Sequence, residues 1–272
     1  MKRLLVLFFL SGIANGFTQS ITLQNGTTQP ADGLVRRDDM VMVTIKTPSG
    51  GVGQIGLNVS DIARLNLPAP AALTDASNDV ASGEYDQALA LIQPVVAYQK
   101  TIRDIPGNYW AKAALIELSA FCGLQRDEEA RALANEITTT SHDPVILSAA
   151  KLEITMITKF NDPRDALVAY DALIGQSKEP QILSQAWIAE GDIRLAQHEF
   201  DEALLAYLTV IVLYPDHNPL VPKALWGSGQ AYDKLKDTVN ATATYRALIS
   251  DYPDTPEASL AKAELIKKEK KT

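Results

Sequence analysis

The side chains that most often carry catalysis or hold metal ions are few and scattered in this sequence. The histidines are His142, His198 and His217. No two of them are four residues apart, and the chain has no His-Glu-x-x-His or Cys-x-x-Cys motif, so a metal site is not predicted. His198 falls between two apolar runs, where we expect a solvated turn residue.

The other reactive groups have structural interpretations. Cys122 is the only cysteine and ends an apolar run, so we expect an unreactive thiol in a core. The carboxylates at 127–129 suit the start of a helix, and Asp38-Asp39 suits a turn. The glycine-rich segment 49–53 lacks the lysine and the following helix of a phosphate loop. We therefore predict a protein that is not an enzyme and that uses no cofactor.

The most regular feature of the chain lies between Trp187 and Pro253, where small and aromatic residues recur after 38 positions. The first copy is Gly191, Ala203, Tyr207 and Pro215, and the second is Gly229, Ala241, Tyr245 and Pro253. Self-similarity at this period is typical of stacked helical repeats. The glycines and alanines allow two antiparallel helices to approach closely, the tyrosines fill the space between neighbouring pairs, and the prolines end each unit.

One small residue can be followed through five such units, which predicts about five helix pairs over residues 73–254. It stands at Ala88, Ala130, Ala166, Ala203 and Ala241, in steps of 42, 36, 37 and 38 residues. Each step exceeds the usual 34, so we expect longer turns between units. Residues 255–272 open with Thr255-Pro256 and end in lysines, which is typical of a capping helix followed by a basic tail.

These residues resemble the tetratricopeptide repeat family. The stretch 252–265, with the 38-residue step, resembles bacterial envelope members of that family, namely the periplasmic component of the Tol–Pal system and the repeat-bearing lipoprotein of outer-membrane assembly. This resemblance covers roughly residues 180–266. The chain lacks the N-terminal coiled coil of the first relative and the lipidated cysteine of the second. The resemblance thus implies the repeat fold and an envelope setting, but neither pathway.

The resemblance also implies where a partner binds, because in this family the first helix of each unit lines a concave face that holds peptides. The family's lysine–asparagine clamp is not reproduced, since Thr155 and Asp192 stand where asparagine is expected. Trp226 is the strongest contact candidate, because tryptophan is enriched at binding hot spots, although packing is an equally good interpretation. The binding candidates are Lys151, Thr155, Lys159, Gln185, Ile188, Asp192, Lys223, Trp226, Gln230 and Asp233.

A second binding candidate is the segment 103–110, which lies in the longest step between units. Its aromatic residues Tyr109 and Trp110 could contact a partner as part of an inserted loop. The alternative, which we favour, is that Asn108 caps a helix and Trp110 packs inward.

Residues 20–67 differ from the rest of the chain, because apolar and β-branched residues alternate there with polar ones. We predict four or five short strands that form a small antiparallel module, either SH3-like or a curled sheet, followed by a proline-rich linker at 68–72. A core of this size is marginal alone, so we expect it to dock on the first helices or on another chain. Its strand edges offer a route to self-association.

The first residues predict export. Lys2 and Arg3 precede the apolar run 4–10 and small residues up to Gly16, which is typical of a signal peptide over residues 1–16. Its removal would leave 23 basic and 33 acidic residues, a net charge of −10 that disfavours nucleic acid as a partner. We therefore expect a periplasmic or extracellular protein without a lipid anchor or an integral membrane segment.

The predicted fold is mostly α, a solenoid of helix pairs preceded by the small β module. The predicted function is a non-enzymatic scaffold or adaptor that binds protein or peptide partners in the bacterial envelope. Two alternatives stay open: an accessory module of an envelope enzyme or polysaccharide machine, and a self-assembling structural protein joined through the β module.

Overall fold

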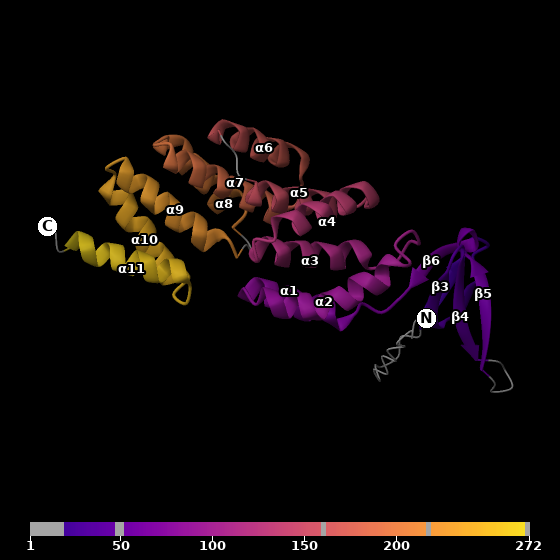
Figure 1. Cartoon of the computed structure of the whole chain (residues 1–272). Helices are drawn as coiled ribbons and strands as arrows, with labels where there is room; N and C mark the ends of the chain where they lie inside the picture. The colour runs from indigo at the N-terminus through magenta and orange to yellow at the C-terminus, as the bar shows by residue number, and fades with distance from the viewer. Residues whose placement is uncertain (1–18, 47–51, 159–161, 216–218, 270–272) are drawn as a thin grey trace. The chain divides into compact units, whose positions relative to one another are not determined.

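The chain folds as six strands and eleven helices within residues 19–46, 52–158, 162–215 and 219–269, which the computed structural model describes (Figure 1). The predicted mostly helical fold, with a small antiparallel module before it, is confirmed. The helices are α1 (Ala71–Ser82), α2 (Tyr85–Lys100), α3 (Trp110–Gly123), α4 (Asp127–Thr140), α5 (Pro144–Ile157), α6 (Pro163–Gln176), α7 (Pro180–Ala196), α8 (Phe200–Leu213), α9 (Val221–Lys234), α10 (Thr238–Asp251) and α11 (Pro256–Glu269).

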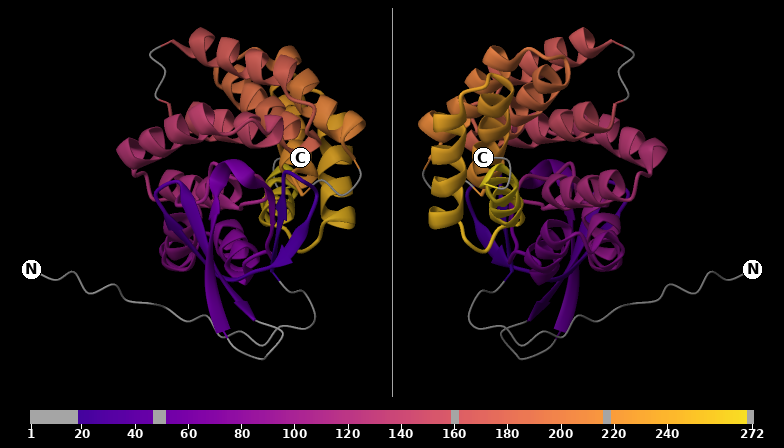
Figure 2. Two further views of the ribbon diagram at one scale, coloured as in Figure 1. Left: turned by 90° about the vertical axis from the view of Figure 1, so that its right-hand side faces the viewer. Right: turned by 90° about the vertical axis from the view of Figure 1, so that its left-hand side faces the viewer.

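The β module consists of two three-stranded antiparallel sheets, with strand orders β2-β1-β6 and β3-β4-β5. Figure 2 shows these strands in indigo and violet. A three-residue edge strand, β2, was not predicted, because its proline at position 30 is tolerated only at a strand end or a sheet edge. The strands are β1 (Ser20–Leu23), β2 (Thr28–Pro30), β3 (Asp32–Arg37), β4 (Met40–Lys46), β5 (Val52–Asn58) and β6 (Ile62–Asn66).

The core of the module takes residues from both sheets and from the segment that follows α2. Alternate residues of the strands point inward, among them Ile21, Val41 and Leu65. Ile102 and Ile105, which follow α2, belong to the same buried cluster. The module therefore does not close its core alone, as the sequence predicted, and the segment after α2 completes it.

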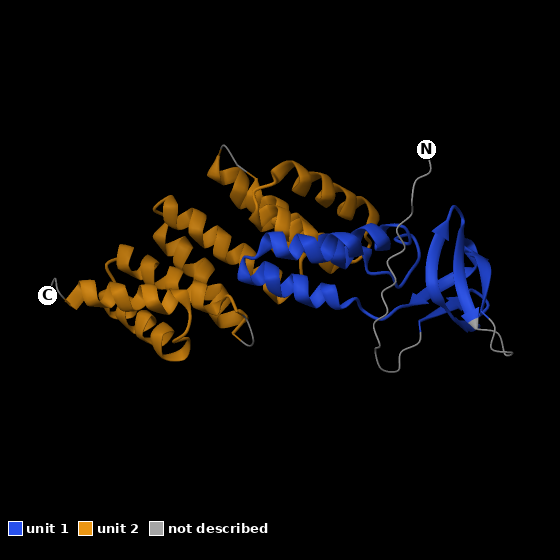
Figure 3. Cartoon of the chain, turned by 60° about the horizontal axis from the view of Figure 1, so that its bottom comes forward, with its two compact units in different colours: residues 1–116 blue, residues 117–272 orange. Residues whose placement is uncertain are grey.

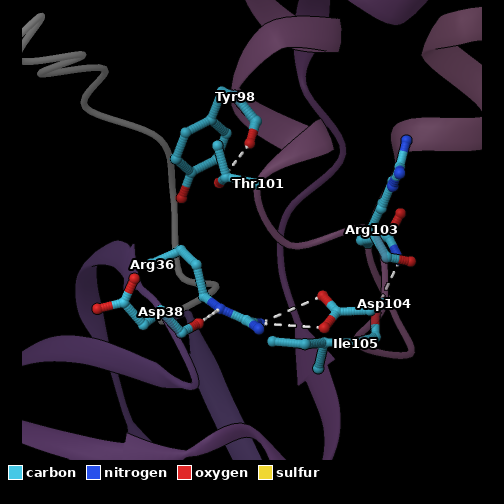
Figure 4. A network of polar contacts seen from close by, with 8 residues as sticks. Arg36, Asp38, Tyr98, Thr101, Arg103, Asp104 and Ile105 are labelled. Atoms are coloured by element: carbon cyan, nitrogen blue, oxygen red, sulfur yellow. Dashed lines mark hydrogen bonds and ion pairs between the residues drawn. The ribbon is translucent and has the colours of Figure 1, made fainter.

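Backbone and polar contacts tie this segment to the module. The Leu65 amide donates to the Pro106 carbonyl at 2.8 Å. Beside it, Gly107 has φ +89°, and a side chain there would collide with the Leu65 carbonyl oxygen, so only glycine fits. Figure 4 shows the neighbouring ion pair, in which Arg36 Nη1 lies 3.2 Å from the Asp104 carboxylate. The β module and the end of α2 are thus joined by core packing, backbone contact and charge.

The five small residues used to count the units all lie in the second helix of a pair and are all buried, which fixes the register of the array. They are Ala88 in α2, Ala130 in α4, Ala166 in α6, Ala203 in α8 and Ala241 in α10. In the C-terminal half, each helix from α4 to α11 contacts the next one along the chain. The first helices α5, α7, α9 and α11 also contact one another in succession, which is the neighbour pattern of stacked helix pairs.

One turn geometry recurs between the two helices of four pairs. Its central residue has a positive φ, and the amide of the residue after it bonds to the carbonyl five positions earlier, which is the Schellman arrangement. His198 occupies such a turn and is exposed, as expected of a solvated turn residue. The central residues are Gly83, Gln125, His198 and Lys236. Three of the four turns therefore use a residue other than glycine.

The chain divides into two compact units, residues 1–116 and 117–272, coloured separately in Figure 3. Unit 1 holds the β module with α1, α2 and the start of α3, and unit 2 holds the remaining helices. Among the helices that the structure describes, none combines the length and apolar character needed to cross a bilayer. The predicted signal peptide lies outside the described residues.

Candidate functional site

The candidate site is the surface of unit 2 formed by the first helices α5, α7, α9 and α11, which we call the concave face because the family resemblance implies one on these helices. Most of the predicted binding residues lie at least partly exposed on these helices. Lys151 is exposed and its Nζ donates to Gln176 Oε1 at 3.0 Å. The Thr155 hydroxyl donates a hydrogen bond to the Lys151 carbonyl within the same helix. Gln185 on α7 and Gln230 on α9 are half-buried.

Ile188 and Lys159 differ from the other eight predicted binding residues. Ile188 is only 2% exposed and packs in the core of α7, α8 and α9, so the structure corrects its assignment to the binding surface. The reason is that this position of α7 faces the second helix of its own pair and the next unit. Lys159 lies outside the described residues.

Trp226 packs against its neighbours, which was one of the two interpretations weighed from the sequence. Its ring lies 5.5 Å from the ring of Tyr245, centroid to centroid, and it packs against the core shared by α9, α10 and α11. It remains half-buried, so part of its surface is still open to solvent. A contact with a partner would therefore be made by a ring already fixed by packing.

Asp192 on α7 is held by contacts from two other helices. The hydroxyl of Tyr207 on α8 donates to Asp192 Oδ1 at 2.7 Å. Lys223 Nζ on α9 lies 3.7 Å from Asp192 Oδ2, and the two side chains are 51% and 52% exposed. Burial, with the Asp192 carboxylate second, raises the pKa of Tyr170 on α6 and of Tyr207. Asp192 is therefore the point where three consecutive units meet.

The tyrosine that holds Asp192 is itself fixed by glycines. Tyr207 is fully buried, and a Cβ added to Gly191 or to Gly227 would lie 2.7 Å or 2.5 Å from atoms of its ring. Gly191 belongs to the same helix pair and Gly227 to the following one. The ring thus lies between two units, as the sequence predicted, and its buried hydroxyl reaches the carboxylate of the exposed Asp192.

A related arrangement occurs one unit further on. The Tyr245 hydroxyl on α10 donates to Asp233 Oδ2 at 3.0 Å, and the Tyr245 ring rests on Gly229. Here the cation comes from α11: Lys268 Nζ bonds to Asp233 Oδ1 and lies 5.1 Å over the Tyr245 ring. The Asp233 and Lys268 side chains are only 25% and 24% exposed. This ion pair is therefore largely shielded from solvent, whereas the pair at Asp192 is about half exposed.

Sequence reasoning missed these hydroxyl and lysine contacts. The two tyrosines were assigned to packing alone, and Lys268 was assigned only to the capping helix. The repeat pattern gives no signal for them, because Asp192 follows Gly191 directly whereas Asp233 comes four residues after Gly229. The two aspartates therefore occupy different positions of their units.

The segment 103–110 takes the form that the sequence favoured. Asn108 Oδ1 accepts from the Trp110 amide at 2.8 Å, which makes Asn108 a helix cap, and Trp110 is buried. The Tyr109 hydroxyl donates to the Leu67 carbonyl at 3.1 Å. Tyr109 therefore connects the start of α3 to the end of the β module within unit 1.

A half-buried polar cluster joins α3 and α5 in unit 2. Ser119 Oγ donates to Glu153 Oε1 at 2.6 Å, and burial raises the pKa of Glu153. Burial, with Glu153 second, raises the pKa of Cys122 to about 12, which keeps the thiol protonated and unreactive at neutral pH. Within the described ranges, no three His, Cys, Asp or Glu side chains come together in a way that could hold a metal ion.

Residues 188–259 match the tetratricopeptide repeat family. This stretch begins in the middle of α7 and ends in the first turn of α11, and so includes both tyrosines described above. This part of the helical array is thus similar to tetratricopeptide repeats, as the sequence resemblance implied. The narrower likeness to the Tol–Pal and outer-membrane assembly proteins is not tested by this match and stays a prediction.

Individual relatives are distant. The human protein O-mannosyl-transferase TMTC1 is 26% identical over 191 residues, which are 69% of this chain and 20% of that protein. The chain therefore spans about a fifth of the length of this curated relative.

Two solved structures can be compared with this chain. A signal transduction ATPase with numerous domains from Pyrococcus horikoshii, which carries a tetratricopeptide repeat sensor, aligns with a TM-score of 0.51 and 17% identity over 70% of this chain and 31% of that one. YrrB, described as a TPR protein with an unusual peptide-binding site, aligns with a TM-score of 0.41 and 17% identity over 72% of this chain and 92% of that one. At these identities the likeness concerns the fold alone.

Proposed function

We propose that this protein is a non-catalytic, exported adaptor that holds a protein or peptide partner of the bacterial envelope on its concave face. The observation that carries the proposal is the row of polar and aromatic side chains on consecutive first helices. Gln185, Asp192, Lys223, Trp226 and Gln230 stay at least partly exposed on α7 and α9 although both helices are packed on either side. The tetratricopeptide repeats support it, because stacked helix pairs offer an extended surface for binding.

Crosslinking with mass spectrometry in native envelope preparations tests the proposal. A photoreactive amino acid placed at Gln230 should give crosslinks to another protein. The matched control places the same residue at Arg246, which is exposed on α10, the second helix of the same pair. Equal crosslinking from both positions would exclude the concave face as the binding surface.

A second candidate function is self-assembly through the β module. Strand β5 is an edge of its sheet, pairs with β4 on one side and contains no charged residue. Uncharged edge strands are templates for pairing with another chain. Self-crosslinks confined to residues 20–67, together with their loss in Gln54→Lys, would favour this function over the adaptor.

A further inference from the structure

The two tyrosine–aspartate contacts at the concave face differ in what completes them. At Asp233 the cation is supplied by Lys268 of α11, which bonds to the carboxylate and covers the Tyr245 ring. At Asp192 the nearest cation is Lys223, whose Nζ is 3.7 Å from Oδ2, a separation too long for a hydrogen bond. The Asp233 carboxylate is therefore hydrogen-bonded to a lysine of the same chain, whereas the Asp192 carboxylate has no hydrogen bond to Lys223.

Asp192 is also the more rigid member of its ion pair. Its Oδ1 is fixed by the hydroxyl of a fully buried tyrosine. Lys223 reaches toward it on a flexible four-carbon stem that is half exposed. An incoming cation can therefore displace Lys223 without moving Asp192.

The charge of unit 2 favours a cationic partner. Residues 117–272 contain 24 acidic and 16 basic residues, a net charge of −8, whereas residues 1–116 contain nine of each. A surface with this excess of negative charge attracts basic segments and repels acidic ones.

We propose that Asp192, positioned by Tyr207, receives a lysine or arginine side chain of the partner, in the way that Asp233 receives Lys268 of α11. The partner segment is thus basic, and Tyr207 is a positioning residue. This inference rests on the proposed adaptor function and names the chemistry of the partner. It also limits the open part of the concave face to α5, α7 and α9, because α11 already covers Asp233.

The first test uses two fluorescent ten-residue probes, (Gly-Lys)5 and (Gly-Glu)5, with the full chain. We expect (Gly-Lys)5 to bind and Asp192→Asn to weaken it about tenfold, as for loss of one hydrogen-bonded ion pair. Asp171→Asn is the matched control, because it removes the same charge from an exposed position on α6. Lys223→Ala should tighten binding, since it removes the competing cation.

Tyr207→Phe isolates the positioning role. It keeps the ring between Gly191 and Gly227 and removes only the hydroxyl that holds Asp192. We expect weaker binding of (Gly-Lys)5, and we expect this loss to vanish when Tyr207→Phe is combined with Asp192→Asn. A purely structural role for the hydroxyl would leave the two losses additive.

A zero-length carbodiimide, which joins carboxylates to contacting amines, gives a readout at the site itself. We expect the probe's lysine to be attached at Asp192, and Asp233 to be joined instead to Lys268 within the chain. The inference would be overturned if the adducts were spread evenly over exposed carboxylates. It would also be overturned if (Gly-Lys)5 did not bind, if Asp192→Asn and Asp171→Asn had equal effects on its binding, or if Lys223→Ala bound it more weakly. If partner crosslinks at Gln230 persist in Asp192→Asn, the adaptor function stands while the inference fails.

Discussion

The contacts that hold the C-terminal repeats to one another differ in kind from those that complete the β module. Between the repeats, a tyrosine ring rests on glycines of adjacent helices, as Tyr207 does on Gly191 and Gly227. In unit 1, the β module meets the segment after α2 through the backbone, where Gly107 lies against the Leu65 carbonyl. The first contact joins residues less than 40 positions apart, and the second closes a core that reaches from Ile21 to Ile105.

The two regions therefore differ in whether their stability comes from local or from long-range contacts. In the repeats, each contact involves only neighbouring units, so stability is close to a sum of local terms. In the β module, the core is incomplete until a distant segment docks, so its parts should unfold together. The following predictions test this contrast, from the largest expected effect to the smallest.

Tyr207→Ala should destabilise unit 2 by about 3–5 kcal/mol, because it leaves a cavity between two helix pairs. Hydrogen exchange should show the loss of protection in α7, α8 and α9 and unchanged protection in the β module. Exchange that rises equally in the module would contradict local coupling among the repeats.

Gly107→Ala should destabilise unit 1 by about 2–4 kcal/mol, because the new methyl group meets the Leu65 carbonyl and the positive φ disfavours alanine. Gly83→Ala is the matched control: its φ of +81° is similar, but no atom lies within 4 Å of the added carbon. We expect the control to cost about 1 kcal/mol, from backbone strain alone. Equal losses in thermal melts of the two variants would show that the contact at Leu65 is unimportant.

Lys236→Gly should stabilise unit 2 by about 0.5–1 kcal/mol. Lys236 has φ +64° in one of the recurring turns, a conformation that costs a non-glycine residue more than glycine. Lys234→Gly is the contrasting variant, since Lys234 is the last residue of α9 and keeps a helical conformation, in which glycine is less favourable than lysine. Denaturant midpoints should therefore move in opposite directions.

Glu153→Gln should raise the stability of unit 2 at neutral pH and have little effect in acid. The folded pKa of Glu153 is raised by burial, so the carboxyl favours folding while protonated, and this contribution is lost as the pH rises through the folded pKa. Glutamine mimics the protonated form and keeps an acceptor for Ser119. Melting temperatures of the two proteins should converge as the pH is lowered, and a constant difference would argue against this titration.

The repeat register was predictable because it depends on residue size at fixed intervals. Ala203, Ala241 and their three equivalents lie where the intervals placed them, since a small residue is required wherever two helices cross closely. The cap at Asn108 was also predictable, because capping depends on neighbours in the sequence.

The candidate site was only partly predictable. Helical spacing identified the helices that carry it, but it assigned Ile188 to the surface, whereas packing against the next unit buries that residue. The contacts of Asp192 and Asp233 come from residues 12 to 35 positions away, on other helices. Such contacts depend on how the pairs stack, which a single sequence with irregular steps of 36 to 42 residues does not specify.

Because the ring of Tyr207 is shared between its own pair and the one that follows, neither pair is a self-sufficient building block. Deleting residues 221–251 would leave this ring facing whatever helix came next. A pair placed after α8 must therefore bring a residue as small as Gly227 opposite the ring of Tyr207.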